Sequence, residues 1–218
     1  MLNTYFKRNK TYVIGVCGPS CGGKTTVCKE IQNKIISTLK NNNNDNNIIC
    51  VISQDSYYNG GNPNTNYDVP ESIDFDLLIA HIKDLIDGRE IDVPIYDFTS
   101  HNRKEESNKC VPTKIIIVEG ILIFSNEKLR ELCDLKVFVE ANEILCYTRR
   151  LRRDTQERGR TFDEVEKRYL EHVVPSSKKY VYPSRDYADI SLINNTHGQF
   201  IGLEIFLDHI EKKINQCK

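Results

Sequence analysis

The amino-acid sequence predicts an α/β fold, in which a mostly parallel sheet carries helices on both faces. Short apolar segments rich in β-branched residues alternate with longer segments whose apolar residues recur at helical spacing. A glycine-rich loop joins the first expected strand to the first expected helix. With 218 residues, 39% of them hydrophobic and 28% charged, the chain is long enough to bury the core of one such domain.

Each strand and helix is expected from a local pattern. Strands are predicted for five apolar segments, residues 12–17, 48–53, 114–118, 135–139 and 189–193. A helix over 24–40 is indicated by one apolar stripe, formed by Val27, Ile31, Ile35 and Leu39. Further helices are predicted over 74–87, which ends before Gly88, and over 199–215, with inward-facing Phe200, Leu203, Phe206, Ile210 and Ile214.

Composition along the chain indicates one domain. Its core is expected to span 11–193 and to include a highly charged, mostly helical segment at about 142–172 that we interpret as a small arginine-rich lid. Residues 194–218 would add a C-terminal helix to the same domain. The tract NNNNDNN at 41–47 is polar and low in complexity, so it predicts a flexible insert.

Charge, hydropathy and cysteine content argue against several classes of protein. The chain has 30 Lys and Arg against 31 Asp and Glu, a net charge of −1, which disfavours nucleic-acid binding. No apolar run approaches the roughly 18 residues that span a bilayer, and the N-terminus lacks an apolar signal core. A soluble, cytoplasmic protein without membrane contact is therefore expected. The eight cysteines form no C-x-x-C pair and are expected to be reduced thiols.

The strongest motif is a phosphate-binding loop, GPSCGGKT, which matches G-x-x-x-x-G-K-[ST] between an expected strand and an expected helix. Its glycines let backbone N–H groups turn toward phosphate oxygens, and the helix N-terminus adds unpaired donors. Lys24, expected on an exposed loop, would contact the β- and γ-phosphates, and the Thr25 hydroxyl would be a ligand of Mg²⁺. The predicted ATP site includes Gly18, Pro19, Ser20, Cys21, Gly22, Gly23, Lys24, Thr25 and Thr26.

This loop indicates a bound nucleotide but does not identify a reaction. A GTPase would need an N-K-x-D motif, and neither Asn33-Lys34 nor Asn108-Lys109 continues in that way. A signature of the L-S-G-G-Q type, expected in an ABC-type ATPase, is also absent from the sequence. What remains is a kinase of a small molecule or nucleotide. A nucleotide-dependent binding module is the alternative of another class, and a base at Asp55 together with the acceptor block 93–103 favours the enzyme.

Two acidic residues follow expected strands, Asp55 after 48–53 and Glu119 after 114–118. Ligands of open α/β sheets bind at the carboxyl ends of the strands, so both acids should face the phosphate-binding loop. Asp55 could accept the proton of an attacking hydroxyl, and Glu119 could hold Mg²⁺ directly or through water. The alternative for each is a capping or solvated acid at a strand end.

Arginines are concentrated between residues 149 and 160. One interpretation is a solvated helix face on which Asp154 and Glu157 are the partners. We favour a lid that closes on the triphosphate, because guanidinium groups stabilise the charge that phosphoryl transfer spreads over oxygen atoms. The residues concerned are Arg149, Arg150, Arg152, Arg153, Arg158 and Arg160.

Longer stretches resemble uridine kinases, also called uridine–cytidine kinases. They are GVCGPSCGGKTTVC (15–28), ISQDSYY (52–58), NYDVPESIDFDLL (66–78), VPIYDFTSHNRK (93–104), VEGILIF (118–124), RRLRRDTQERGR (149–160) and YADI (187–190). The resemblance implies a P-loop kinase fold, Mg²⁺, ATP as co-substrate and a homo-oligomer, a tetramer. It also implies transfer of the γ-phosphate to the 5′-hydroxyl of uridine or cytidine in pyrimidine salvage.

The resemblance further implies roles for single residues. Asp55 would be the base and a neighbour of Mg²⁺, which Thr25 and Glu119 would hold. Asp68 would anchor the ribose hydroxyls. The other implied contacts are Tyr96 and His101 to the pyrimidine edge, Tyr58 and Phe98 as pocket walls, Arg150 and Arg160 to substrate, Arg153 and Arg158 to nucleotide phosphates, and His197 to ATP. Without the resemblance, His101 would be interpreted as an ordinary loop histidine.

The sequence departs from the pattern of these kinases in three places. Arg168 stands where they usually have a glutamine that contacts the sugar, so we predict that Arg168 contacts substrate. Residues 174–177 lack a common aromatic, and 194–196 replace a P-R-G sequence on the adenine side. A P-loop kinase for another small hydroxyl substrate, such as a different riboside or a pantothenate- or ribulose-type alcohol, is the alternative function.

Overall fold

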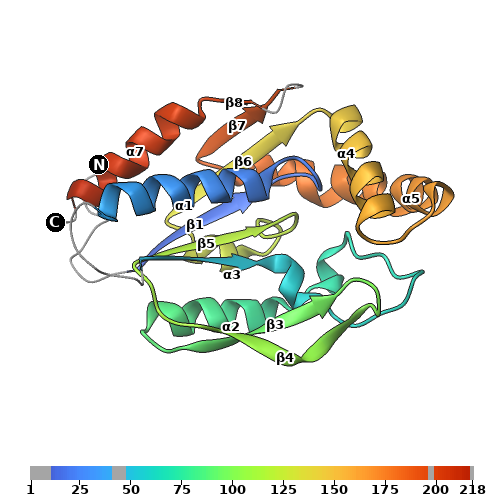
Figure 1. Ribbon diagram of the computed structural model, residues 1–218, viewed down its shortest axis with the longest axis horizontal. Coiled ribbons are helices and arrows are strands. Elements are labelled where there is room, and N and C mark those ends of the chain that lie inside the picture. The colour runs from blue at the N-terminus through green and yellow to red at the C-terminus, as the bar shows by residue number, and fades with distance from the viewer. Residues whose placement is uncertain (1–10, 41–47, 196–198, 217–218) are drawn as a thin grey trace.

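The computed structural model describes residues 11–40, 48–195 and 199–216, and for 38–40 and 213–216 the backbone alone (Figure 1). At its centre is a six-stranded sheet in the order β2-β5-β1-β6-β7-β8. Neighbours from β2 to β7 are parallel, and β8 pairs antiparallel with β7. The strands are β1 (Tyr12–Cys17), β2 (Ile49–Ser53), β5 (Ile115–Gly120), β6 (Leu135–Ala141), β7 (Ile190–Asn194) and β8 (Phe200–Ile201).

The register of the central strands brings their carboxyl ends to one edge of the sheet. Cys17 at the end of β1 lies beside Gly120 of β5, and Ser53 at the end of β2 lies beside Glu119. The chain segments that leave these strands therefore start from the same edge. This edge carries the phosphate-binding loop, Asp55 and Glu119.

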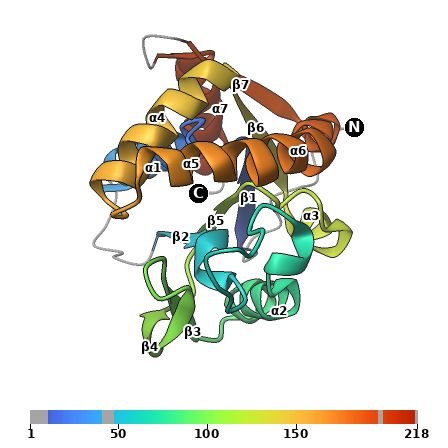
Figure 2. The same ribbon diagram turned by 90° about the vertical axis from the view of Figure 1, so that its right-hand side faces the viewer.

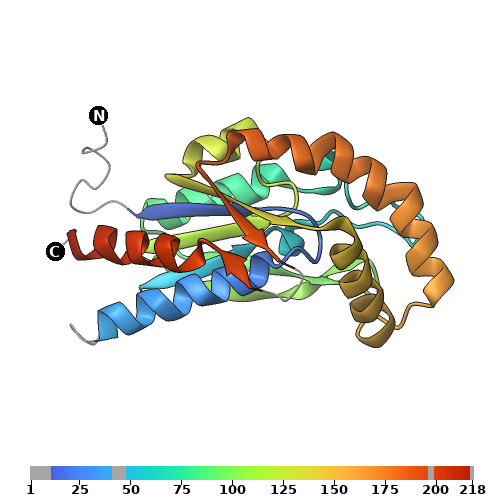
Figure 3. The ribbon, with the colours of Figure 1, turned by 90° about the horizontal axis from the view of Figure 1, so that it is seen from above.

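Helices cover both faces of the sheet. On one face, α1 (Lys24–Lys40) and α7 (Leu203–Gln216) lie side by side, and Lys34 of α1 pairs with Glu211 of α7 at 2.7 Å (Figures 1 and 3). On the other face lie α2 (Phe75–Ile86) and α3 (Glu127–Leu132). Side chains of β1 alternate between two cores, with Val13 in one and Ile14 in the other. This alternation is what a strand buried on both faces requires.

A separate two-stranded sheet, β3 (Ile91–Asp97) and β4 (Asn102–Cys110), forms an antiparallel hairpin beside the main sheet (Figure 2). His101 at its tip has a left-handed φ of 58°. Asn, Asp and His occur there more often than other non-glycine residues. The hydrogen bond from the Gly61 N–H to the His101 carbonyl, at 3.0 Å, holds this turn in place.

The charged segment 142–172 is helical and stands above the strand ends (Figures 2 and 3). It contains α4 (Glu143–Gln156) and α5 (Phe162–Arg168), and Asn142 and Thr161 cap their N-termini. Helical turns continue after it through Tyr187, including α6 (Val174–Ser176) and two π-helical turns, Tyr169–Val173 and Ser177–Val181.

The predicted fold class is confirmed, and the five expected strands all form, within one or two residues of their expected bounds. One helix prediction was wrong at its start: α7 begins at Leu203, because Gly202 has a φ of 83° and Phe200–Ile201 pairs with β7 instead. Phe206 and Ile210 are buried as expected. The insert 41–47, His197 and the side chains of Leu39 and Ile214 lie outside what the structure describes.

Two further expectations concern cysteines and membranes. The cysteines that the structure describes, Cys17, Cys21, Cys28, Cys50, Cys110, Cys133 and Cys146, are all free thiols. Within the described ranges, no helix is both long enough and apolar enough to cross a bilayer.

Candidate active site

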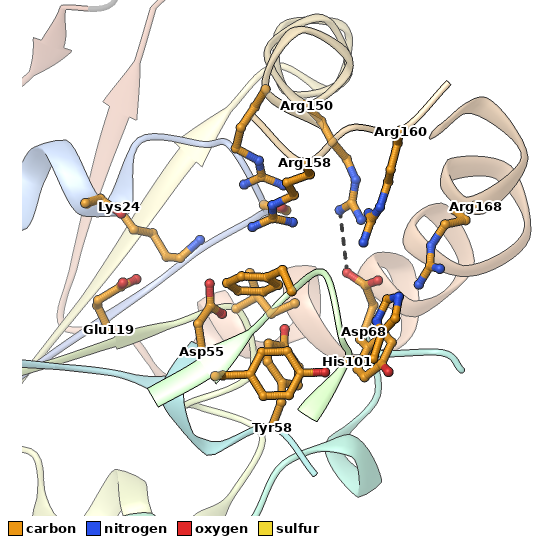
Figure 4. Close-up of a pocket in the computed structure, with 17 residues that line it drawn as sticks. Lys24, Asp55, Tyr58, Asp68, His101, Glu119, Arg150, Arg158, Arg160 and Arg168 are labelled. Carbon is orange, nitrogen blue, oxygen red and sulfur yellow. Dashed lines mark ion pairs between the residues drawn. The ribbon is translucent and has the colours of Figure 1, made fainter. Parts of the chain in front are cut away.

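A pocket opens at the carboxyl edge of the sheet, between the phosphate-binding loop, the β3–β4 hairpin and the helical segment 142–172 (Figure 4). Most residues that the sequence predicted for the site lie in its wall. The lining residues are Ser20, Lys24, Thr25, Asp55, Tyr58, Tyr67, Asp68, Tyr96, Phe98, His101, Glu119, Ile121, Arg150, Arg153, Arg158, Arg160 and Arg168. Two strands (β3 and β5), the segments that follow β1 and β2, the N-terminus of α1 and the charged segment therefore contribute to one cavity.

The phosphate-binding loop takes its shape from left-handed backbone positions. Gly18 and Gly23 have φ values of 149° and 105°, and Cys21 has 59°. A Cβ on Gly18 would collide with the Val139 carbonyl oxygen, so only glycine fits there. Six predicted loop residues shape or flank the loop without lining the pocket: Gly18, Pro19, Cys21, Gly22, Gly23 and Thr26.

Lys24 is more buried than expected. Its exposed fraction is 8%, and its Nζ donates a hydrogen bond to the Pro19 carbonyl at 3.0 Å. The prediction of an exposed loop lysine was wrong, because the loop wraps around its own side chain. The ammonium nevertheless lies in the pocket, facing Glu119 and Asp55 (Figure 4).

The two predicted carboxylates face the loop. Asp55 lies in a single 3₁₀ turn, Gln54–Tyr57, directly after β2, and its N–H donates to the Ser53 hydroxyl at 3.3 Å. That hydroxyl donates to Glu119 Oε1 at 2.9 Å, so Ser53 links the two acidic positions. The sequence had suggested that Glu119 follows the strand. In the structure Glu119 is part of β5. Burial raises the pKa of Glu119, and the nearby Lys24 opposes this shift.

These groups fit Mg²⁺ as it is bound in kinase sites. Thr25, Asp55 and Glu119 all line the pocket and offer oxygen ligands. Among the described residues, no group of three or more His, Cys, Asp and Glu forms a closed metal site. A few protein oxygens with the remaining positions left to phosphates and water is the arrangement that Mg²⁺ prefers.

The far half of the pocket is aromatic. Tyr58 lies against Tyr96 with ring centroids 5.3 Å apart, and Phe98 lies 5.2 Å from Tyr96. Tyr67 stacks on His101 at 5.5 Å, with an interplanar angle of 10°. Flat walls of this kind suit a planar ring. Tyr67 and Ile121 were not predicted, although Tyr67 precedes Asp68 in a stretch that the sequence singled out.

Two groups in this half can form directional hydrogen bonds. The Tyr96 hydroxyl is buried and has no hydrogen-bond partner in the described part of the chain. Burial, and then the neighbouring Tyr67 hydroxyl, raise the pKa of Tyr96, which keeps it a donor. The Tyr67 hydroxyl lies near the Tyr96 hydroxyl, but the two groups do not meet the geometry of a hydrogen bond. Burial, followed by the charges of Arg160 and Arg168, lowers the pKa of His101, so its ring is neutral and offers one donor and one acceptor.

Arginines form the wall opposite the strands (Figure 4). Arg150 is 7% exposed, and its Nη1 lies 3.8 Å from Asp68 Oδ1. The Arg158 guanidinium lies over the Phe98 ring, 4.1 Å from its centroid. Arg153 and Arg160 complete this wall. Four of the six arginines, Arg150, Arg153, Arg158 and Arg160, therefore line the pocket, whereas Arg149 and Arg152 do not, and Arg152 is exposed as a solvated helix face would have it.

Arg168 occupies its own position between the charged segment and a loop. It donates hydrogen bonds to the carbonyls of Pro63 and Thr65, the latter at 3.3 Å, and lies 5.8 Å from the Tyr67 ring centroid. It also lines the pocket. Its contacts connect α5 to the loop that precedes Tyr67.

Comparison with known proteins decides the family. The sequence profile of the "Phosphoribulokinase / Uridine kinase family" matches residues 13–197. The chain belongs to this family. A uridine kinase of Lactococcus lactis subsp. cremoris (strain MG1363) is 39% identical over 216 residues, covering 94% of this chain and 98% of the relative. A uridine kinase of Clostridium botulinum (strain Okra / Type B1) is 43% identical over 194 residues, covering 86% and 90%.

Solved structures share the fold of this family member at low sequence identity. A protein from Silicibacter sp. TM1040, described as a candidate fructose transport system kinase, has a TM-score of 0.65 at 16% identity, covering 87% of this chain and 92% of that one. A possible uridine kinase from Bacillus stearothermophilus has a TM-score of 0.52 at 18% identity, covering 86% and 91%. These likenesses show the fold alone.

Proposed function

We propose that this protein is a kinase that transfers the γ-phosphate of ATP to the 5′-hydroxyl of uridine, and of cytidine, in pyrimidine salvage. The uridine kinases that it resembles are similar over nearly their whole length. The pocket supports the proposal because it joins a phosphate-binding end to an end lined by aromatic side chains.

At the phosphate-binding end, backbone N–H groups of the loop and the ammonium of Lys24 bind the phosphates. Lys24 Nζ exchanges its bond with the Pro19 carbonyl for phosphate oxygens. Arg153 and Arg158 approach the phosphates from the opposite wall. Positive groups on two sides stabilise the charge that spreads over the transferred phosphoryl group.

At the reaction centre, Asp55 accepts the proton of the 5′-hydroxyl as that oxygen attacks the γ-phosphorus. This role is supported by the position of Asp55 directly after β2, in the wall of the pocket that Lys24 and Tyr58 also line. When bound, Mg²⁺ held by Thr25, Asp55 and Glu119 would neutralise charge on the β- and γ-phosphates.

At the aromatic end, Asp68 binds the ribose hydroxyls, and Arg150, at 3.8 Å, keeps its carboxylate in place. Tyr96 donates to O4 of uridine or to N3 of cytidine, and neutral His101 pairs with the same edge. Tyr58 and Phe98 enclose the ring. Because buried polar groups would be left unpaired by a misfitting base, a purine should be a poor acceptor.

The segment 142–172 acts in this proposal as a lid on a core of residues 11–193, with Arg160 and Arg168 on the substrate side. Its arginines belong to α4, α5 and the turn between them. A homo-oligomer, as the resemblance implies, is part of the same proposal. Sedimentation of the purified protein measures that state directly.

The observation that carries the proposal is the coexistence of Lys24, Asp55 and the orphaned Tyr96 hydroxyl in one pocket. The test is ADP release with Mg·ATP against uridine, cytidine, adenosine, guanosine and pantothenate- or ribulose-type alcohols, with the product identified by mass spectrometry. We expect kcat/KM for uridine to exceed that for adenosine by at least about 10²-fold. Preference for adenosine, or turnover of a non-nucleoside alcohol alone, would favour the alternative kinase function.

A further inference from the structure

Asp154 occupies the centre of the arginine wall. Its side chain is 1% exposed. Oδ1 lies 2.8 Å from Arg153 Nη2 and 3.5 Å from Arg158 Nη1. Oδ2 lies 3.1 Å from Arg160 Nη1 and 3.6 Å from Arg150 Nε. One buried carboxylate therefore contacts four guanidinium groups.

The four arginines are exposed to the pocket, and Asp154 is not. The arginines line the pocket, whereas Asp154 is not among the residues that line it. Figure 4 shows Arg150, Arg158 and Arg160 reaching from the charged segment toward the strand ends. Asp154 therefore lies behind the arginines, where it can act on substrate only through them.

The path of the backbone brings the arginines of α4 and the arginines that follow α4 to the same carboxylate. Arg150 and Arg153 lie on α4 with it, and α4 ends at Gln156. The chain then turns at Gly159, whose φ is 64°, and the Arg160 N–H donates to the Asp154 carbonyl at 3.1 Å. This return brings the side chains after the helix back to the same carboxylate.

The charges in this cluster do not balance. Four guanidinium groups surround Asp154, and the only further carboxylate paired with one of them among the described residues is Asp68, 3.8 Å from Arg150, so positive charge exceeds negative charge. Burial and then the charge of Arg153 lower the pKa of Arg158. Burial alone would raise the pKa of Asp154, but Arg153, Arg150 and Arg158 outweigh it and hold that pKa below its usual value.

We propose that Asp154 is a positioning residue for phosphoryl transfer, which holds Arg150, Arg153, Arg158 and Arg160 converged on the pocket before a polyphosphate is bound. The inference rests on the proposed kinase function. The cluster keeps an excess of positive charge that a bound triphosphate neutralises. Asp154 thereby reduces the repulsion that would otherwise separate the arginines, and the polyphosphate completes the neutralisation. Preorganised charge of this kind acts mainly on the transition state.

The kinetic test is Asp154→Asn, which keeps the size of the side chain and removes its charge. We expect kcat with uridine to fall by about 10- to 100-fold, because misaligned arginines stabilise the transferred phosphoryl group poorly. The KM for ATP should change by less than about threefold, because the added positive charge offsets the lost alignment. Asp154→Glu keeps the charge and should recover part of the lost kcat.

The second test measures thermal unfolding with and without inorganic tripolyphosphate, which supplies the anion without any reaction. Removing one partner of a buried ionic cluster should lower the Tm of Asp154→Asn by about 5 to 15 °C without the anion. Saturating tripolyphosphate should raise the Tm of this variant more than that of the wild type. A role in packing alone would give the same loss with and without the anion.

The matched control is Glu157→Gln, which removes an exposed carboxylate at the end of the same helix and should leave kcat and Tm unchanged. A kcat of Asp154→Asn within about twofold of the wild type would overturn the proposal, as would an equal Tm loss in both conditions. If Asp154→Asn does not fold, kcat and the Tm with and without tripolyphosphate are compared between Asp154→Glu and the wild type. A wild type inactive with every nucleoside would refute the proposed function, while the tripolyphosphate experiment would still decide the role of Asp154.

Discussion

The two ends of the pocket are built in different ways. The loop of the phosphate-binding end comes from one continuous stretch, residues 18–25, in a backbone shape that its glycines allow. The aromatic end is assembled from segments far apart in the chain, which supply Tyr58, Tyr67 and the hairpin tip. Phosphate binding by a glycine-rich loop is shared by many proteins. The choice of acceptor, in contrast, depends on how distant segments of the chain meet at the aromatic end.

This comparison predicts two kinds of variant. Changes at the phosphate-binding end and at Asp55 should reduce the rate for every acceptor by the same factor. Changes at the aromatic end should alter the ratio of rates between acceptors, with little effect on ATP. The ratio of kcat/KM for uridine to that for cytidine separates the two kinds.

The largest effect is expected for Asp55→Asn, which removes the proposed base and keeps its size. Loss of general-base catalysis should lower kcat by about 10² to 10⁴ for uridine and cytidine alike. Steady-state ADP release measures the loss, and Asp76→Asn, an exposed acid on α2, is the control. A kcat within tenfold of the wild type would remove Asp55 from the reaction.

Lys24→Ala should follow, with a loss of about 10² to 10³ in kcat, because the ammonium stabilises charge on the transferred phosphoryl group. Since Lys24 is buried, circular dichroism and Tm must show that the variant folds. Lys29→Ala, exposed on the same helix, is the matched control. A folded Lys24→Ala variant with normal turnover contradicts the assignment of the loop.

His101→Ala addresses the aromatic end. We expect kcat/KM for uridine to fall by about 10- to 10³-fold, while the KM for ATP stays the same. Because the pKa of His101 is lowered by burial and then by Arg160 and Arg168, the wild-type ring stays neutral down to below its usual pKa. The wild-type kcat/KM should therefore not fall between pH 7.5 and about 6.5 through this group. His209→Ala, exposed on α7, serves as control, and an unchanged kcat/KM in His101→Ala argues against base recognition by this residue.

Arg168→Gln should have a smaller effect. The change breaks the contacts to Pro63 and Thr65, which hold α5 against the loop before Tyr67. We expect KM for uridine to rise by about two- to tenfold, as for the loss of a partly exposed charged hydrogen bond. Lys167→Gln, exposed on the same helix, should change nothing. A rise in KM for ATP instead would place Arg168 at the phosphate-binding end.

The smallest effect is expected from replacing residues 41–47 by a short turn. The tract joins α1 to β2, and closing a loop costs only about 0.6 kcal/mol for each doubling of its length. The kcat and KM values should stay within about twofold of the wild type. Loss of turnover in a folded deletion variant would reveal a role for the tract.

Sequence alone determined the parallel sheet, the loop and the two carboxylates at the strand ends. The reason is that these features depend on short-range rules: β-branched segments form strands, and a glycine-rich turn before a helix forms a phosphate site. The start of α7 was missed by four residues, because antiparallel pairing of Phe200–Ile201 with β7 is a contact between separate segments. The burial of Lys24 was missed for a similar reason, since the loop folds back over its side chain.

Only the tertiary structure decided how the acceptor end is built. The resemblance named His101, but the stack of Tyr67 on it depends on a hairpin and a loop that meet in space. The role of Asp154 also became visible only when arginines from both sides of the Gly159 turn were seen around it. A charged residue on a helix looks solvated in a sequence, because burial depends on which segments pack above it and no local pattern records that.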